Sequence, residues 1–449
     1  MDQIDIALRG SFQGFLKQVR EHAPDWAPDG LLQRFAPFPM GWQCLKALGV
    51  DNFSKQYEGV AGLRIKAYSM DGRFLSEGVN FGTQDALSLA RHPAVLQSVQ
   101  EALLQHGLHA GASSALLGNS RPVHELSQAL GQYLGRVQCE VFQGGWGACY
   151  GAVRALVGPQ DHAVFDALAH NSLVEGGRAS GASIHHFAHL DVQALANKLI
   201  ELRAEFPRAG ILVVTESVFS MDGDAPDLRQ HLDVCRAHRA TLLVDVSHDF
   251  GAFGPRGLGE LGAQGVLDEV DVIVGSLSKA FASNGGFVAT HEPGFELALR
   301  YAGTSSTFAA QLSPLQAAAA LKALSIIDSP EGDALRGRLQ SNCQTARTRL
   351  RASGWQVLGD AGALVPVVLG GMGRSRLIQR SLLQKGVVTN LVEYPAVPRN
   401  ASRLRLQFMA DHTPEHIDFL VRTLGEAAQE ADAALADINQ TRPAEQQIS

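Results

Sequence analysis

A regular alternation of short apolar runs with longer amphipathic stretches, from about residue 86 to residue 325, most constrains the fold of this chain. The apolar runs include AGILVVTES, ATLLVDVSH and VDVIVGSLS, and stretches such as HPAVLQSVQEALLQHG and APDLRQHLDVCRAHRA lie between them. Strands that alternate with helices are typical of βαβ units, which build a largely parallel sheet. We therefore predict an α/β fold, with helices on both faces of a mostly parallel central sheet.

The regions on either side differ in pattern. Residues 1–85 form an N-terminal segment of amphipathic pieces, Pro- and Gly-rich connectors and a predicted hairpin that turns at Asp71-Gly72. Residues 86–325 are the predicted large domain. Residues 326–430 contain helical stretches and the apolar runs LVPVVLGG and RLRLQFM, so we expect a smaller C-terminal α+β domain there. Residues 431–449 are predicted to be a polar tail.

Composition narrows the classes of function. The formal net charge is -7, so no positive field favours nucleic acid or an anionic membrane. The longest apolar runs are too short to cross a bilayer, and the N-terminus lacks a signal-like apolar core. The five cysteines are odd in number and include no CxxC pair, which indicates a reducing compartment and no structural zinc. We expect a soluble cytoplasmic protein with no bound metal, no transmembrane segment and no nucleic-acid partner.

Polar side chains follow the predicted strands, at the edge where open parallel sheets bind ligands. Taken singly, each of them has an ordinary explanation as a helix cap, a turn former or a solvated charge. They are Glu216, Ser220 and Asp222 after ILVVT, Asp245 and His248 in and after TLLVD, Ser276 and Lys279 after DVIVG, and the turn Gly144-Gly145-Trp146-Gly147 after EVF.

Together these residues fit one kind of chemistry. Glycines at the start of a helix let backbone N–H groups bind a phosphate, and Ser276 can donate to the same phosphate. A carboxylate at Asp245 can keep a ring nitrogen protonated. Lys279 has no acid nearby in sequence, so it can lose its proton and form an imine with an aldehyde. A phosphate, a pyridinium nitrogen and an aldehyde are the three binding groups of pyridoxal 5'-phosphate (PLP).

The order of these residues resembles that of fold-type I PLP-dependent enzymes, and more narrowly that of the α-oxoamine synthase family. The resemblance runs from about Asn80 to near Glu430, and therefore covers most of the chain. It rests on the stretches HNSLVEGGRASGA, ESVFSMDGDAPDL, DVSHDFGAFGPRGLG, GSLSKAFASNGGF and YPAVPRNASRLRLQFMADHTPEHID. It implies a fold-type I transferase with PLP as its cofactor.

The resemblance also implies a role for individual residues. Lys279 would form the imine with PLP and later move the α-proton of the substrate, and Asp245 would pair with the ring nitrogen. His170 would stack on the ring, and His248 would bind its phenolic oxygen or the substrate. The other implied contacts are Gly145, Trp146 and Ser276 with the phosphate, Ser220 in the stretch that lines the cofactor, and Arg405 with the substrate carboxylate, with Arg403 as the fallback.

By the same resemblance, a homodimer would condense a small amino acid with an acyl thioester of coenzyme A or of an acyl-carrier protein. The carboxyl group would be lost, which leaves an α-amino ketone. The chain departs from the family pattern at Ala115, Cys149 and Val246, where arginine, asparagine and an acidic residue are expected, and these departures leave the acyl donor open. Two alternatives also stay open. One is a PLP-dependent aminotransferase or a carbon–carbon lyase that acts on a β-hydroxy amino acid, and the other is a non-catalytic scaffold subunit.

Overall fold

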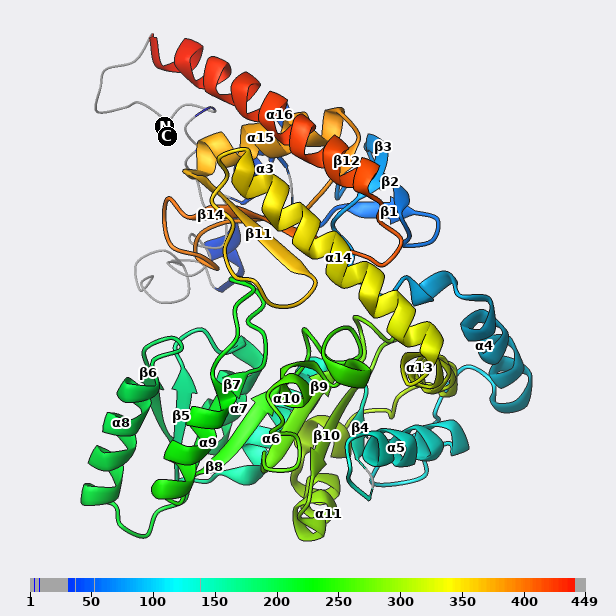
Figure 1. Ribbon diagram of the computed structural model, residues 1–449, viewed down its shortest axis with the longest axis vertical. Helices are drawn as coiled ribbons and strands as arrows, with labels where there is room; N and C mark the ends of the chain where they lie inside the picture. Colours follow the sequence, from blue (N-terminus) through cyan, green and yellow to red (C-terminus); the bar gives the residue numbers. More distant parts are fainter. Residues whose placement is uncertain are drawn as a thin grey trace.

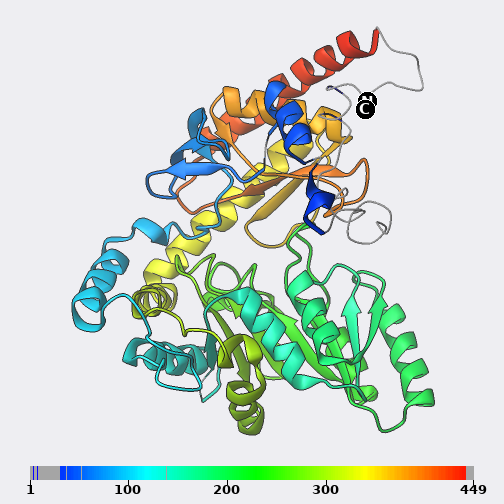
Figure 2. The same ribbon diagram turned by 180° about the vertical axis from the view of Figure 1, so that it is seen from behind.

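The computed structural model describes residues 31–440 except 37, 52 and 138, together with Ile4 and Leu8. The rest of residues 1–30, which belong to the predicted N-terminal segment, and residues 441–449 of the predicted tail lie outside the described residues. A large lobe contains the largest sheet, and a small lobe contains two smaller sheets (Figure 1). Helix α14 (Pro330–Ala352) runs from one lobe to the other, as both opposite views show (Figure 2).

The large lobe is built around a seven-stranded sheet, in the order β4-β10-β9-β8-β7-β5-β6. Strands β5 to β9 run parallel to their neighbours, whereas β10 runs antiparallel to both β9 and β4. The predicted mostly parallel sheet is confirmed. The strands are β4 (Glu140–Phe142), β5 (His162–Asp166), β6 (Ser183–Phe187), β7 (Ile211–Glu216), β8 (Thr241–Asp245), β9 (Val272–Ser276) and β10 (Gly286–Thr290).

Helices cover both faces of this sheet, which explains why its central strands are continuous apolar runs. In β8, Leu243 packs into one core beneath α6 and α7, while Leu242 and Val244 pack into the other core with α8 and α9. The helices of this lobe are η2 (Leu89–Arg91), α4 (Pro93–His106), α5 (Arg121–Tyr133), α6 (Gly145–Leu156), α7 (Asn171–Ser180), α8 (Val192–Glu205), α9 (Leu228–Ala237), η3 (Pro255–Gly257), α10 (Gly259–Ala263), α11 (Pro293–Ala302), α12 (Thr304–Thr307) and α13 (Pro314–Ile327).

The small lobe is built from segments near both ends of the described chain. The predicted hairpin is confirmed, because β2 and β3 pair antiparallel and Gly72 at the turn has a left-handed φ of 84°. Strand β3 also pairs in parallel with β12, which comes from the predicted C-terminal domain. The first sheet has the order β1 (Gln56–Glu58), β2 (Arg64–Tyr68), β3 (Phe74–Asn80) and β12 (Val387–Val388), and the second has the order β11 (Leu364–Gly370), β14 (Ser402–Gln407) and β13 (Leu391–Val392).

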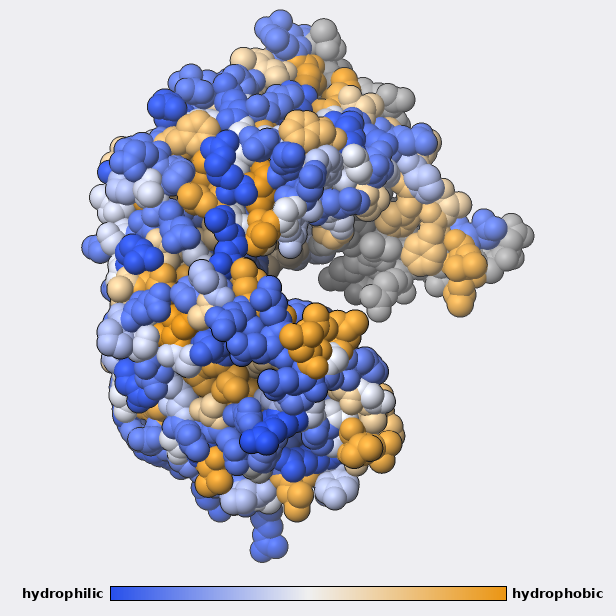
Figure 3. All heavy atoms as spheres, turned by 90° about the vertical axis from the view of Figure 1, so that its right-hand side faces the viewer, coloured by the Kyte–Doolittle hydropathy of each residue, from blue (hydrophilic) through white to orange (hydrophobic). Residues whose placement is uncertain are grey.

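Four further helical segments belong to this lobe: η1 (Leu31–Phe35), α3 (Phe38–Ala47), α15 (Met372–Gln384) and α16 (Pro414–Gln440). Helix α16 continues beyond residue 430, where the polar tail was predicted to begin, because Ala431 and Leu435 keep the helical spacing of its buried face. The domain limits themselves stay a prediction. Across the described residues, each helix is too short or too polar to serve as a membrane span. The space-filling view shows a deep hollow between the two lobes (Figure 3).

Candidate active site

The carboxyl ends of the central strands meet at one edge of the large sheet, as predicted. Glu216 at the end of β7 is the cross-strand neighbour of Asp245 at the end of β8. A cavity of about 180 Å³ opens beside them. Of the predicted site residues, the structure places Gly145, Trp146, His170, Asp245, His248, Ser276 and Lys279 in its lining, together with Cys149, Ser172, Glu216, Ser247 and Ser278. Ser220, Arg403 and Arg405 lie outside this lining.

The amine of Lys279 is unpaired, since it makes no hydrogen bond or ion pair with any residue in the described part of the chain. Burial lowers the pKa of Lys279, and the charge of Arg405 lowers it further, although Asp245 acts in the opposite direction. Loss of a proton turns a lysine into a nucleophile. The site therefore favours an amine that can attack an aldehyde.

The carboxylate of Asp245 is held on both oxygens. Its Oδ1 accepts a hydrogen bond from the Ser247 N–H at 2.9 Å, and its Oδ2 accepts one from the Cys149 thiol at 3.2 Å. Burial and the neighbouring Asp245 charge raise the pKa of Cys149 well above its usual range, so the thiol keeps its proton and acts as the donor. The sequence pattern marks Cys149 only as a departure from the family. Its contact with Asp245 joins residues 96 positions apart.

Both predicted histidines line the cavity as neutral rings. Burial lowers the pKa of His170 and places that of His248 well below its usual range, and the positive charges of Lys279 and Arg405 act in the same direction. His170 precedes helix α7, and its Nδ1 lies 2.7 Å from the Ser172 hydroxyl. These contacts fix the imidazole of His170 at the wall of the cavity.

Glu216 binds the backbone of His170, a role that the sequence does not reveal. Its Oε1 accepts a hydrogen bond from the His170 N–H at 2.6 Å. Burial and the nearby charge of Asp245 raise the pKa of Glu216 well above its usual range. The side chain thus positions the loop that carries His170.

The two predicted arginines lie on the same face of β14 but differ in their partners. The Nη1 atom of Arg403 forms an ion pair with Asp222 at 2.6 Å and donates to the carbonyl of Met221. Arg405 donates only through Nε, to the carbonyl of Ser220 at 2.8 Å, and its two Nη groups have no partner among the described residues. Burial lowers the pKa of Arg405 to about 10, so it stays charged at neutral pH.

A tight contact forms the opposite wall, where α6 begins. A Cβ atom placed on Gly145 would come within 2.5 Å of the Ser276 Cβ, so only glycine allows the helix to start this close to β9. Trp146, the next residue, is 54% exposed and stacks on Tyr150 with ring centroids 5.1 Å apart. The N–H groups of the helix start and the Ser276 hydroxyl therefore lie on one side of the cavity, as a phosphate requires.

A charged triad braces the loop that leads to His170. The ring of His189 lies between two carboxylates, with Nδ1 2.8 Å from Asp166 and Nε2 3.1 Å from Asp224. Burial opposes a charge on this ring, but the hydrogen bonds to both carboxylates raise the pKa of His189 to about 10. Asp166 also accepts a hydrogen bond from the Leu168 N–H at 2.8 Å. His189 is therefore an imidazolium that ties the His170 loop to the loop after β7.

These residues fit PLP on structural grounds. The cavity combines an unpaired amine at Lys279, a buried carboxylate at Asp245, a flat neutral ring at His170, and a helix start that only glycine allows so close to Ser276. These groups can hold the aldehyde, the ring nitrogen, the ring face and the phosphate of the cofactor, respectively.

Comparisons with known proteins agree with a PLP-dependent enzyme. The family model described as aminotransferase class I and II matches residues 76–424. An 8-amino-7-oxononanoate synthase of Pseudomonas entomophila (strain L48) is 34% identical over 355 residues, which are 79% of this chain and 89% of that protein. Serine palmitoyltransferase from S. paucimobilis, solved with a bound PLP–myriocin aldimine, is 30% identical with a TM-score of 0.83, over 90% of this chain and 100% of that chain. The Sphingomonas wittichii serine palmitoyltransferase is 29% identical, with a TM-score of 0.83 over 90% of this chain and 99% of that chain. The chain therefore belongs to the α-oxoamine synthase family of fold-type I, PLP-dependent C-acyltransferases.

Proposed function

We propose that this chain condenses a small amino acid with an acyl thioester. A carbon–carbon bond forms between the α-carbon and the acyl carbon, the thiol leaves, and the carboxyl group is lost as CO₂, which gives an α-amino ketone. The observation that carries the proposal is the unpaired amine of Lys279 near the Arg405 guanidinium, whose two Nη groups have no partner among the described residues. The amine of Lys279 lines the cavity, and the charge of Arg405 is close enough to lower the pKa of Lys279.

The chain contributes binding groups and one mobile proton. When bound, PLP supplies an aldehyde and a ring that stabilises negative charge on the α-carbon of the amino acid. Lys279 would hold the cofactor through Nζ and, once the amino acid has replaced it there, would take the α-proton on the same atom. Asp245 would accept a hydrogen bond from the protonated ring nitrogen. Neutral His170 offers its flat face to the ring, and neutral His248 can donate to the phenolic oxygen.

Arg405 is the proposed ligand of the substrate carboxylate. A guanidinium binds a carboxylate through two parallel N–H groups, and the contact of Arg405 Nε with Ser220 leaves both Nη groups for that purpose. Arg403 already forms an ion pair with Asp222, so a substrate would have to displace a carboxylate to bind it. We therefore assign the role to Arg405 rather than to Arg403.

The acyl group would arrive on coenzyme A or on an acyl-carrier protein. The relatives named above are synthases or acyltransferases, which favours condensation over aminotransfer or carbon–carbon cleavage. A non-catalytic scaffold has no need of an unpaired lysine amine beside a buried carboxylate, and this argues against that alternative.

We also propose a homodimer with its contact near the start of α6. A bridge between Ser113 and Ala310 brings two exposed apolar segments together there. Large apolar surfaces of this kind mark protein contacts. The residues are Leu116 (78% exposed), Leu117 (91%), Phe308 (82%), Tyr301 (75%) and Trp146 (54%). Light scattering behind a sizing column should give twice the mass of the chain, and Leu117→Asp combined with Phe308→Asp should give a monomer.

The reaction is tested with purified protein supplied with PLP, a panel of amino acids and acyl thioesters. Thiol and CO₂ should appear together and in equal amounts. Borohydride should fix the cofactor to the peptide that carries Lys279, and Lys279→Ala should abolish both the label and thiol release. Release of an aldehyde without use of thioester would instead identify a lyase, and transfer of the amino group to a keto acid would identify an aminotransferase. Bound cofactor without exchange of the substrate α-proton would identify a scaffold.

A further inference from the structure

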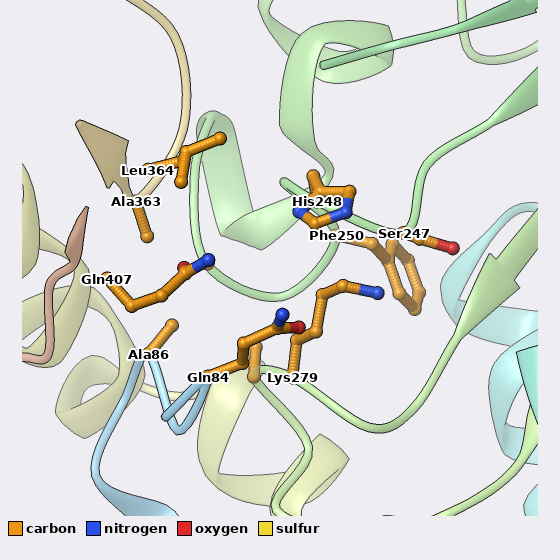
Figure 4. A pocket seen from close by; sticks show the side chains of 11 residues that line it. Gln84, Ala86, Ser247, His248, Phe250, Lys279, Ala363, Leu364 and Gln407 are labelled. Atoms are coloured by element: carbon orange, nitrogen blue, oxygen red, sulfur yellow. The ribbon is translucent and has the colours of Figure 1, made fainter. Parts of the chain in front are cut away.

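A second, smaller hollow adjoins the cavity described above, on the side of the small lobe (Figure 4). Its free volume is about 10 Å³, enough for about one water molecule or one oxygen atom, and it shares Ser247, His248 and Lys279 with that cavity. The small lobe and the loop after β3 close it with Gln84, Ala86, Ala363, Leu364 and Gln407. Lys279 is therefore bordered by two compartments, and the proposed roles account for only one of them.

Gln407 is firmly placed at the end of β14, but its side chain lacks a partner. Its N–H donates to the carbonyl of Phe81 at 2.9 Å, and Leu364 is its neighbour across the sheet. The side chain is only 4% exposed, and its Nε2 atom makes no hydrogen bond in the described part of the chain. Buried amide groups are rarely left unpaired, because each loses its hydrogen bonds to water without replacement. Because Gln407 lines the hollow beside Lys279, its unpaired donor points to a ligand.

The direction of this side chain supports the same conclusion. The amides of Gln407 and Gln84 both extend into the hollow, which Lys279 also lines (Figure 4). The Gln84 side chain likewise makes no hydrogen bond to a described residue. Most of the other lining side chains are apolar, among them Ala86, Ala363 and Leu364. The compartment is thus a small apolar space in which neutral amides are the hydrogen-bonding groups of the small lobe.

The position of Gln407 relative to Arg405 indicates what it binds. The two residues are two positions apart in β14, so they share one face of the strand about 7 Å apart. If the Arg405 guanidinium takes the carboxylate, Gln407 meets a different part of the bound substrates. A neutral amide donor suits a neutral oxygen, because a charged one would be better served by the arginine.

We infer that Gln407 is a substrate-binding residue, whose Nε2 donates a hydrogen bond to a neutral substrate oxygen. The inference rests on the proposed function. Two substrate groups offer such an oxygen, namely the side-chain hydroxyl of an amino acid such as serine and the carbonyl of the acyl thioester. In the first case the protein prefers serine to alanine, and in the second it uses either amino acid but relies on Gln407 to hold the thioester.

The decisive variant is Gln407→Met, which keeps the length of the side chain and removes the donor. With PLP-loaded protein, serine and alanine are titrated separately while the absorbance of the cofactor is followed, and the KM for the thioester is measured with each. A single neutral hydrogen bond predicts a loss of about threefold to tenfold. The loss falls on serine alone if the hydroxyl is the ligand, and on the KM of the thioester alone if the carbonyl is. Ser402→Ala removes a buried, unpaired hydroxyl from the same strand outside the hollow, and should leave all three values unchanged.

Equal serine, alanine and thioester values in wild type and Gln407→Met would overturn the inference, and would mean that water alone satisfies the amide. Gln407→Leu gives the same measurements if the methionine variant folds poorly, which its melting temperature will show. Failure of the proposed function looks different, because wild-type protein would then release no thiol from the thioester with any amino acid. The two ideas can therefore fail separately.

Discussion

The charged triad around His189 makes a prediction that is independent of catalysis. In His189→Gln, a neutral amide replaces the imidazolium and can donate to only one of the two carboxylates. Asp166, which is fully buried, and Asp224 then face each other without a cation between them. We expect the free energy of unfolding at pH 7 to fall by about 3 kcal/mol. Breaking one side of a buried ion pair costs about 3–5 kcal/mol, and we take the lower end because the His189 side chain is 23% exposed.

The dependence on pH follows from the raised pKa. The unfolded chain releases this proton near pH 6.5, whereas the folded protein holds it until about pH 10. The stabilisation is therefore complete below pH 6.5 and is lost as the pH rises through 10. Between those values the folded state carries one extra proton, so the advantage of wild type over His189→Gln shrinks by about 1.4 kcal/mol per pH unit, or about 2.7 kcal/mol from pH 7 to pH 9.

Urea unfolding of the cofactor-free protein at several pH values, followed by circular dichroism, measures this difference. Hydrogen exchange at pH 7 should also show faster local opening at the N–H groups of Leu168 and Leu190, which both donate to Asp166. His124→Gln, an exposed histidine in α5, is the matched control and should behave like wild type. A difference between wild type and His189→Gln that stays constant from pH 7 to pH 9 would refute the reasoning, because it would mean that the folded protein holds a neutral ring.

Three further predictions concern the site itself. Gly145→Ala should weaken PLP binding at least tenfold in an equilibrium titration, because the added Cβ would lie 2.5 Å from Ser276; unchanged affinity would mean that α6 can shift freely. Arg405→Lys should raise the KM for the amino acid about tenfold with little change in the melting temperature, since a point charge replaces a two-pronged donor, and an unchanged KM would rule out the assigned role. Cys149 and the other four cysteines are buried, so native protein should resist iodoacetamide at pH 7, while unfolded protein should take up five labels by mass spectrometry; rapid native labelling would contradict the burial.

Much of the architecture can be predicted from the sequence, because the large lobe follows local rules. Apolar runs became buried strands, and periodic stretches became helices close to their predicted ends. The reversed direction of β10 follows from chain length, since residues 277–285 are too few for the crossover of about a dozen residues that a parallel connection needs. The extension of α16 was missed because the few apolar residues beyond residue 430, such as Ala431 and Leu435, stand among polar ones, and the stretch therefore resembles a frayed tail.

The site was only partly predictable, for a physical reason. Residues at or just after strand ends, such as Asp245 and Lys279, can be recognised in the sequence, because the sheet brings all strand ends to one edge. Contacts made by side-chain packing cannot be recognised in this way. The Glu216 hydrogen bond to the His170 backbone spans 46 positions, and the Cys149 contact with Asp245 spans 96. Neither pairing has a local signal, and the unpaired amide of Gln407 can be recognised only when its surroundings are known.

The parallel pairing of β3 with β12 has a consequence for how this chain is made. Val79 pairs with Val387, so 308 residues must be synthesised before the strand finds its partner (387 − 79 = 308). At about 5–20 residues per second, that wait lasts about 15–60 s. During this time the hairpin emerging from the ribosome presents an open strand edge, the kind of surface that recruits other chains into aggregates. The nascent protein therefore carries this open edge until Val387 has been translated, after the whole of the large lobe has been synthesised.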